Sequence, residues 1–320
     1  MIQLTELLQG AKTVAIAGHI RPDGDCVGSC MGLSLYIRKY FPEIAVTVYL
    51  GDFQDSYQFL EGTDQISRDY GKEISYDVFF ALDCADMARL GEAGRYFETA
   101  KKTVCIDHHI SNQAFAQVNY IEPEASSASE LVCNILEADK ITKEMAEALY
   151  MGIAHDTGVF SYSCTSSRTM RTAGMLMDKG IDFTKIIDST YNEKTYLQNQ
   201  ILGRALLESI MMLDNQIIFS AIRQKEMKFY GVEPKDLDGI VQQLRNTKGV
   251  EAAIFLYETG PQEFKVSMRS NGRIDVSRIA CYFGGGGHVK AAGCTMQGSV
   301  YDVVNNLVAH MDKQLRQVET

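Results

Sequence analysis

The sequence lacks the long apolar run that a membrane-spanning helix requires. Such a helix takes roughly 18 or more consecutive apolar residues, and no stretch of the 320 residues approaches that length. The opening residues, MIQLTELLQGAK, also lack the basic start and apolar stretch of a secretory signal. The sequence therefore predicts a cytoplasmic protein with no membrane partner.

Paired cysteines and an excess of positive charge are missing too. The eight cysteines are scattered singly, many of them inside apolar runs, which favours reduced core residues over a disulfide framework. Cys26 and Cys30 are spaced like a metal pair, but we interpret them as small residues packed on one helix face. The net charge of −10 argues against long duplex nucleic acid as a partner, because that binding requires many phosphate neutralisations.

The composition that is present is that of a globular protein long enough for two domains. Hydrophobic residues make up 46% of the chain and charged residues 22%. Residues 212–320 contain 13 Lys and Arg against 12 Asp and Glu, whereas residues 1–211 contain 18 against 29. The acidic first part suits a cation site, although a charge that serves solubility explains this distribution equally well.

The first half alternates short β-rich runs with helical segments, which predicts an α/β fold with a parallel sheet. A Ser127 to Glu130 capping box predicts the start of a helix. The expected strands are Thr13–Gly18, Ala45–Leu50, Val78–Leu82 and Thr103–Ile106, and the expected helical segments are Val27–Tyr40 and about Ser129–Ala154.

The second half predicts a smaller α/β domain behind a connecting helix. The proline-free run Tyr191–Leu213 is helix-prone and is interpreted as a linker helix. We therefore expect a catalytic domain over 1–190, the linker helix over 191–213 and a second domain over 214–320. The second domain's expected elements are strands at 217–222, 252–258 and 264–270, a helix Pro234–Arg245, a glycine-rich loop and a last helix Val300–Gln314.

Metal-ligand residues follow three of the four expected strands of the first half. Taken alone, each of these residues could simply belong to a turn or cap a helix. Because the carboxyl ends of parallel strands share one edge, we expect these side chains to converge there. The set comprises His19, Asp23 and Asp25 after the first strand, Asp83 after the third, Asp107, His108 and His109 after the fourth, and Asp156 after a helix.

Clustered carboxylates repel one another unless cations lie between them. Carboxylates with imidazoles and no required thiolate favour harder divalent ions over a structural zinc. Mn²⁺ fits best, while Mg²⁺, Fe²⁺ and Co²⁺ remain open. Because the ligands outnumber the needs of one ion, we expect two divalent metal ions, about 3.5–4 Å apart.

These motifs resemble those of the DHH phosphoesterase family. GHIRPDGDCVGS, ALDCAD, IDHH and HDTG are similar to its four successive motifs, and GGGGHVKAAG is similar to the signature of an accompanying C-terminal domain. The resemblance implies that Asp83 bridges two ions and that His109 orients the phosphate or protonates the leaving oxygen, while Asp107 fixes a neighbouring imidazole. It implies one ion on His19, Asp23 and Asp83, and the other on Asp25, Asp83, His108 and Asp156.

The glycine-rich segment has a chemistry of its own. Successive glycine amides can form an anion nest, and an arginine can bind a phosphate through two parallel hydrogen bonds. A flexible hairpin loop is the simpler alternative. We expect substrate-binding residues at Arg269, Gly285, Gly286, Gly287 and His288, whereas Arg278 is expected to be a surface charge.

Within the family, a chain with both parts resembles nanoRNase-type oligoribonucleases. This implies short RNA or dinucleotide substrates and the removal of phosphate from adenosine 3′,5′-bisphosphate. Hydrolysis of cyclic di-AMP or its linear product is the alternative. His155 and Asp156 also suggest an all-helical HD-type hydrolase, against which the β-rich strands argue. A non-catalytic nucleotide sensor is the other class considered, and a homodimer remains open.

Overall fold

The computed structural model of the protein describes residues 3–318, which divide into two compact units between Glu193 and Lys194. Both units combine sheets with helices, which confirms the α/β fold. Within the described residues, no helix combines the length and the apolar character needed to cross a membrane.

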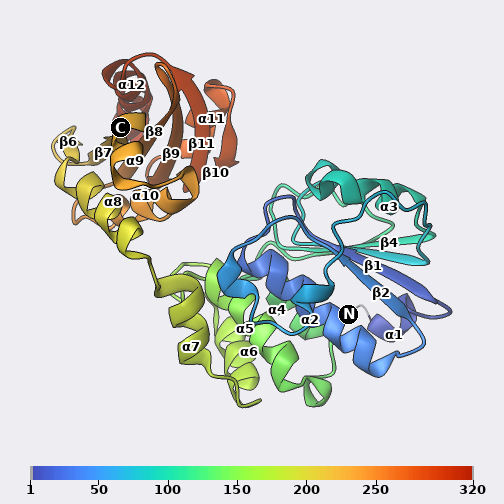
Figure 1. Ribbon diagram of the computed structural model, residues 1–320. Coiled ribbons are helices and arrows are strands. Elements are labelled where there is room, and N and C mark those ends of the chain that lie inside the picture. The colour runs from blue at the N-terminus through green and yellow to red at the C-terminus, as the bar shows by residue number, and fades with distance from the viewer. Residues whose placement is uncertain (1–2, 319–320) are drawn as a thin grey trace. The chain divides into compact units, whose positions relative to one another are not determined.

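The first unit is built on a five-stranded, all-parallel sheet with the order β2-β1-β3-β4-β5 (Figure 1). Its strands are β1 (Thr13–Ala17), β2 (Ala45–Tyr49), β3 (Val78–Leu82), β4 (Lys102–Asp107) and β5 (Val118–Ile121). Its α-helices are α1 (Leu4–Leu7), α2 (Gly24–Tyr40), α3 (Gly94–Thr99), α4 (Ala128–Ile135), α5 (Lys143–Asp156), α6 (Ser167–Met177) and α7 (Phe183–Ile187).

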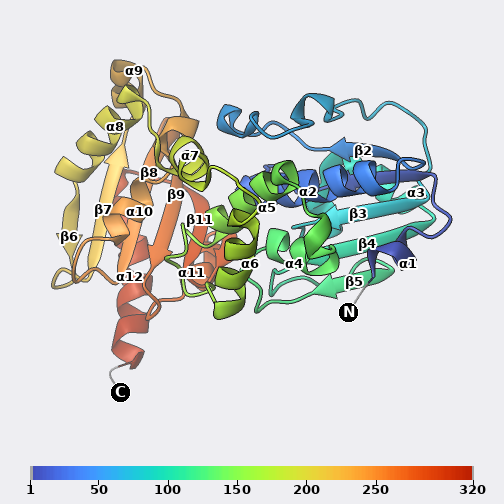
Figure 2. The same cartoon turned by 90° about the horizontal axis from the view of Figure 1, so that it is seen from below.

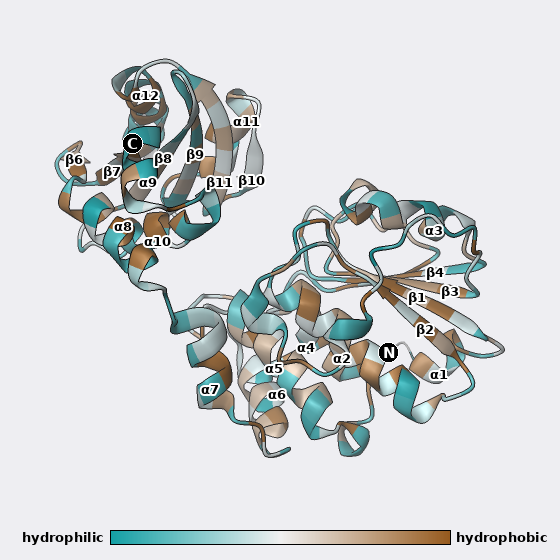
Figure 3. Cartoon of the chain, viewed as in Figure 1, coloured by the Kyte–Doolittle hydropathy of each residue, from teal (hydrophilic) through white to brown (hydrophobic). Residues whose placement is uncertain are grey.

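Both faces of this sheet are covered, which is why its strands are continuous apolar runs. Ile16, Phe80 and Ile106 pack on one face in a core shared with α2, α4 and α5. Phe79 and Ala81 belong to the core on the other face, where the Phe79 ring meets Phe97 of α3. Figure 3 shows the apolar colour concentrated on these strands.

The second unit contains a mixed six-stranded sheet with the order β10-β11-β9-β8-β7-β6, in which β7 and β8 are parallel and the other pairs antiparallel. Its strands are β6 (Ile210–Met212), β7 (Ile217–Ile222), β8 (Ala252–Gly260), β9 (Glu263–Ser270), β10 (Gly286–His288) and β11 (Ala291–Gln297). Its α-helices are α8 (Tyr196–Leu207), α9 (Gln224–Tyr230), α10 (Ile240–Arg245), α11 (Val276–Tyr282) and α12 (Val300–Val318).

Helices cover both faces of this sheet (Figure 2). One face packs against α11 and α12 through residues such as Val266 and Leu307. On the other face, α8 and α10 pack on β7 and β8. Along β9, residues alternate between buried and partly exposed, so Lys265, Ser267 and Arg269 lie on the side away from α11.

Several predicted boundaries are wrong. Within the predicted helix Tyr191–Leu213, the α-helix is α8 alone, because a π-helix ends at Asn192, a Thr195–Gln198 capping box starts α8 late and Ile210–Met212 pairs with β7. The predicted helix Pro234–Arg245 breaks at Gly239, whose φ is +86°. The predicted helical segment about Ser129–Ala154 is confirmed as helical and divides into α4 and α5. The expected glycine-rich loop is partly a strand, because β10 pairs with β11.

The start of α4 also differs from the expected capping box. Ser127 caps the helix by accepting a hydrogen bond from the Glu130 amide, as predicted. The Glu130 carboxylate does not return to the Ser127 amide. It accepts instead from the amide and hydroxyl of Ser126, because Arg168 and Thr169 hold it on that side.

Candidate metal centre

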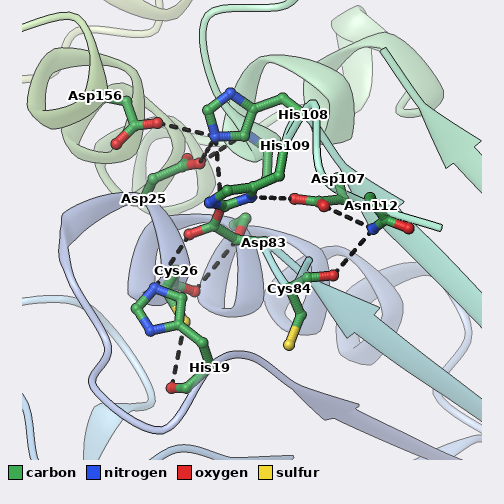
Figure 4. Close-up of polar contacts among 12 residues, drawn as sticks. His19, Asp25, Cys26, Asp83, Cys84, Asp107, His108, His109, Asn112 and Asp156 are labelled. Atoms are coloured by element: carbon green, nitrogen blue, oxygen red, sulfur yellow. Dashed lines mark hydrogen bonds and ion pairs between the residues drawn. The ribbon is translucent and has the colours of Figure 1, made fainter. Parts of the chain in front are cut away.

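Asp83 lies at the centre of the ligand cluster, directly after β3 (Figure 4). Its φ is +53°, a left-handed conformation that aspartate tolerates better than most residues. One carboxylate oxygen lies 3.4 Å from His19 Nε2, and the other lies 3.5 Å from His108 Nε2. Asp83 therefore faces two separate groups of side chains, one through each oxygen.

The first group surrounds His19, which follows β1. His19 Nε2 is 3.7 Å from Asp23 Oδ1, and that same oxygen caps α2 by accepting from the amides of Asp25 and Cys26. The buried Cys26 thiol lies with His19 and Asp83 in one compact set of potential ligand atoms, all within 4.8 Å of one another. From the sequence, this thiol is expected to be a packing residue on a helix face and not a metal ligand.

The second group joins Asp25, His108 and Asp156 (Figure 4). His108 Nε2 lies 3.0 Å from Asp156 Oδ2 and 4.0 Å from Asp25 Oδ2. Asp25 comes from the first turn of α2 and Asp156 from the last residue of α5, so two packed helices and the end of β4 supply this group.

His109 is held beside the second group by Asp107. The imidazole Nδ1 is 2.7 Å from Asp107 Oδ1 and 3.7 Å from Asp83 Oδ1. Asn112 donates to the other oxygen of Asp107 at 2.6 Å and to the Cys84 carbonyl at 3.0 Å. Burial alone would lower the pKa of His109, but the Asp107 and Asp83 carboxylates raise it above its usual value.

The electrostatics of the cluster call for additional positive charge. Burial, together with the charges of Asp83 and Asp156, raises the pKa of Asp25 well above its usual value. Burial opposes protonation of His108, yet Asp156 and Asp83 raise its pKa to about 12. Asp83 Oδ1 is buried and accepts no hydrogen bond from the described residues. Divalent cations would satisfy this oxygen and offset the carboxylates, so the residues fit such ions.

The predicted substrate residues lie together in the second unit. Arg269 in β9 pairs with Ala291 of β11, which in turn pairs with His288 of β10. Gly285 and Gly287 approach β11 so closely that an added Cβ would lie 2.2 Å from the Gly293 oxygen and 2.5 Å from the Ala291 oxygen, respectively. The exposed Gly286 lies between them in the sequence.

Several residues of the site were not found from the sequence. Asn112 follows the histidine pair closely and could have been suspected as its hydrogen-bond partner. The amides of Ala128 and Ser129 donate to Asp25, and no local sequence pattern predicts this contact. The His155 imidazole lies within hydrogen-bond distance of the Tyr57 and Thr190 hydroxyls. Because the first unit contains a parallel sheet, the alternative of an all-helical HD-type hydrolase is wrong.

A parallel α/β sheet with carboxylates and imidazoles gathered at its carboxyl edge is suited to metal-dependent hydrolysis. Residues 13–153 match the DHH family, N-terminal domain, and residues 197–317 match the DHHA1 domain. The chain therefore contains a DHH-family N-terminal domain and a DHHA1 domain, and it is a phosphoesterase.

Relatives match this chain over nearly its whole length. The Bifunctional oligoribonuclease and PAP phosphatase NrnA of Bacillus subtilis is 25% identical over 98% of this chain and 99% of its own. The protein of the same name from Mycoplasma pneumoniae is 29% identical, with coverages of 96% and 94%. The Cyclic-di-AMP phosphodiesterase GdpP of B. subtilis is 26% identical over 97% of this chain but 49% of its own.

A solved structure is similar over nearly the whole chain. The crystal structure of an exopolyphosphatase-related protein from Bacteroides fragilis superposes with a TM-score of 0.91. It is 27% identical in sequence and covers 99% of this chain and 96% of its own.

Proposed function

We propose that this enzyme hydrolyses the phosphodiester bonds of RNA fragments a few nucleotides long, and that it removes phosphate from adenosine 3′,5′-bisphosphate. The observation that carries this proposal is Asp83, whose two carboxylate oxygens face two ligand groups. The full-length likeness to proteins named oligoribonuclease and PAP phosphatase supports the substrate class.

We propose two Mn²⁺ ions as cofactors. His19, Asp23 and Asp83 would hold one ion, and Asp25, Asp83, His108 and Asp156 the other. Bound ions would supply an activated water and neutralise charge on the phosphoryl oxygens. The Cys26 thiol lies close enough to the first group to change its preference among metals.

His109 is the residue proposed to act on the leaving group. The Asp107 carboxylate fixes the imidazole through Nδ1, and the imidazole so held would protonate the leaving oxygen. Asn112 in turn fixes Asp107, so the orientation of the imidazole does not depend on solvent.

The second unit would bind the far end of the substrate. Arg269 supplies a planar guanidinium suited to a terminal phosphate, and Gly286 and His288 lie exposed in β10 of the same sheet. An acidic chain with this binding site favours short, end-bound substrates over polymers.

Hydrolysis rates on four substrates with Mn²⁺ test the proposal. We expect a dinucleotide and adenosine 3′,5′-bisphosphate to be hydrolysed, and an RNA of about 24 nucleotides and cyclic di-AMP to be hydrolysed at least about tenfold more slowly. The long RNA serves as the control for length. Equal rates on long and short RNA would contradict the proposal, and so would the absence of any hydrolysis, which would favour a nucleotide sensor.

Hydrolysis of cyclic di-AMP is the second candidate, which the likeness to the GdpP phosphodiesterase favours. In the same experiment, a rate on cyclic di-AMP that exceeds the rate on the dinucleotide would establish this alternative.

A further inference from the structure

The Asp25 carboxylate is held by the N-terminus of α4. Oδ2 accepts a hydrogen bond from the Ala128 amide at 2.6 Å, and Oδ1 accepts from the Ser129 amide at 2.8 Å. Asp25 is fully buried, so water does not compete for these contacts. The first turn of α4 thus fixes which lone pairs of Asp25 point toward His108 and Asp156.

The next residue of α4 belongs to a second, separate network. Glu130 is fully buried, and its carboxylate accepts hydrogen bonds from four donors. These donors are the Ser126 amide at 3.0 Å, the Ser126 hydroxyl at 2.5 Å, the Thr169 hydroxyl at 3.0 Å and Arg168 Nε at 2.6 Å. Arg168 also donates to Glu122 at 2.8 Å.

This network secures the segment that presents the two amides to Asp25. Ser126 immediately precedes the capping residue Ser127, and Glu130 lies three residues after that cap, so their contact fixes the chain on both sides of the two amides that Asp25 accepts from. Arg168 and Thr169 belong to α6, which anchors the turn to a second helix. A carboxylate with four donors has one favoured position.

We propose that Glu130 is a positioning residue for the metal centre, which sets the affinity of the Asp25 group for its ion without touching that ion. Glu130 belongs to none of the compact groups of potential ligand atoms. Residues one layer away from a metal's ligands typically change its affinity by about 10- to 100-fold. The inference rests on the proposed function, because it takes Asp25 as a metal ligand.

The test measures binding of Mn²⁺ alone to the metal-free protein. The readout is the electron paramagnetic resonance signal of free Mn²⁺. In Glu130→Gln, an amide NH₂ would face donors, so the network breaks. We expect about tenfold weaker binding of one ion with the other unchanged. Raising the Mn²⁺ concentration should restore kcat, because Glu130 does not contact the substrate.

Asp77→Asn is the matched control. Asp77 likewise accepts four hydrogen bonds, from Lys101, Thr13 and the amides of Lys12 and Thr13, but it lies at the amino end of β3, the end of that strand opposite Asp83. We expect this variant to lower the unfolding midpoint while it leaves both Mn²⁺ affinities unchanged. Equal loss of Mn²⁺ binding in both variants would overturn the inference, because general loosening would then explain it.

Two further variants separate the possible failures. If Asp25→Asn binds both ions normally, the proposed metal centre itself is wrong. If Asp25→Asn loses one ion but Glu130→Gln does not, only the positioning role is wrong. Should Glu130→Gln fail to fold, Arg168→Gln removes one donor from a partly exposed position. Unchanged Mn²⁺ affinity in that variant would overturn the inference.

Discussion

At the scale of single residues, Asp83 carries more of the site than any of its neighbours because each of its oxygens faces a different group. Asp83→Asn keeps the size of the side chain and removes its charge. We expect it to bind both ions weakly and to lose more than about 100-fold in kcat, beyond what residues outside the ligand set typically cost. Mn²⁺ titration and the dinucleotide assay measure these effects.

Asp86→Asn is the control for that substitution. Asp86 lies three residues later, where its exposed carboxylate accepts a hydrogen bond from the Arg89 amide at 3.0 Å. This variant should keep full Mn²⁺ binding and turnover. Normal Mn²⁺ stoichiometry in Asp83→Asn would contradict the bridging role.

Asp77 gives a prediction about pH at the amino ends of the strands. The ion pair with Lys101 at 2.7 Å, followed by the amides of Lys12 and Thr13, lowers the pKa of this carboxyl. A lowered pKa in the folded state stabilises the protein above the ordinary aspartate pKa of about 4, and this stabilisation is lost as the pH falls toward the folded-state value.

Asp77→Asn should therefore destabilise the protein by roughly 1–2 kcal/mol at pH 7. The gap in unfolding free energy between the two proteins should narrow below about pH 4, where the native carboxylate becomes protonated. Urea unfolding at pH 7, 5 and 3.5 measures this gap. A gap that stays constant with pH would show that the charge of Asp77 does not contribute.

At the scale of elements, the sequence predicted the strands of the first sheet and the edge at which their carboxyl ends meet. The strands of the first sheet are apolar runs because both faces are covered, and their shared carboxyl edge predicted that His19, Asp83 and His108 would meet. The contact of Asp25 with Ala128 joins residues 103 positions apart, so no local pattern contains it. The boundaries of α8 also depended on a tertiary contact, the pairing of β6 with β7.

The close approach of α5 to α2 and α4 gives a prediction at this scale. A Cβ on Gly152 would lie 2.0 Å from the Ser129 hydroxyl and 2.9 Å from Asp25 Oδ1. Gly152→Ala should therefore displace both and weaken Mn²⁺ binding by at least about tenfold. It should also destabilise the fold by about 1–3 kcal/mol through overpacking.

Gly174→Ala is the matched control, because a Cβ at this helical position of α6 would meet nothing within 4 Å. It should stabilise the protein by about 0.5–1 kcal/mol and leave Mn²⁺ binding unchanged. Thermal unfolding and Mn²⁺ titration compare the two variants. Normal Mn²⁺ affinity in Gly152→Ala would show that the helices can separate without moving Asp25.

At the scale of the whole molecule, the two units divide the proposed chemistry between them. Each unit has its own hydrophobic core, and the ligand cluster belongs to the first unit whereas Arg269 and His288 belong to the second. Metal binding and substrate capture should consequently respond to different substitutions. A single shared site would instead make every substitution affect both properties.

Arg269→Ala separates these two properties. Loss of a charge-assisted contact with a phosphate costs about 1.5–3 kcal/mol, so KM for the dinucleotide should rise roughly 10- to 100-fold with kcat nearly unchanged. The KM of Arg269→Lys should lie between those of the wild type and Arg269→Ala, because lysine keeps the charge and loses the bidentate geometry. Arg278→Ala, which removes an exposed arginine paired with Asp275, should behave like the wild type. Mn²⁺ content should stay the same in all three variants, and a loss of bound Mn²⁺ in Arg269→Ala alone would mean that the second unit takes part in metal binding.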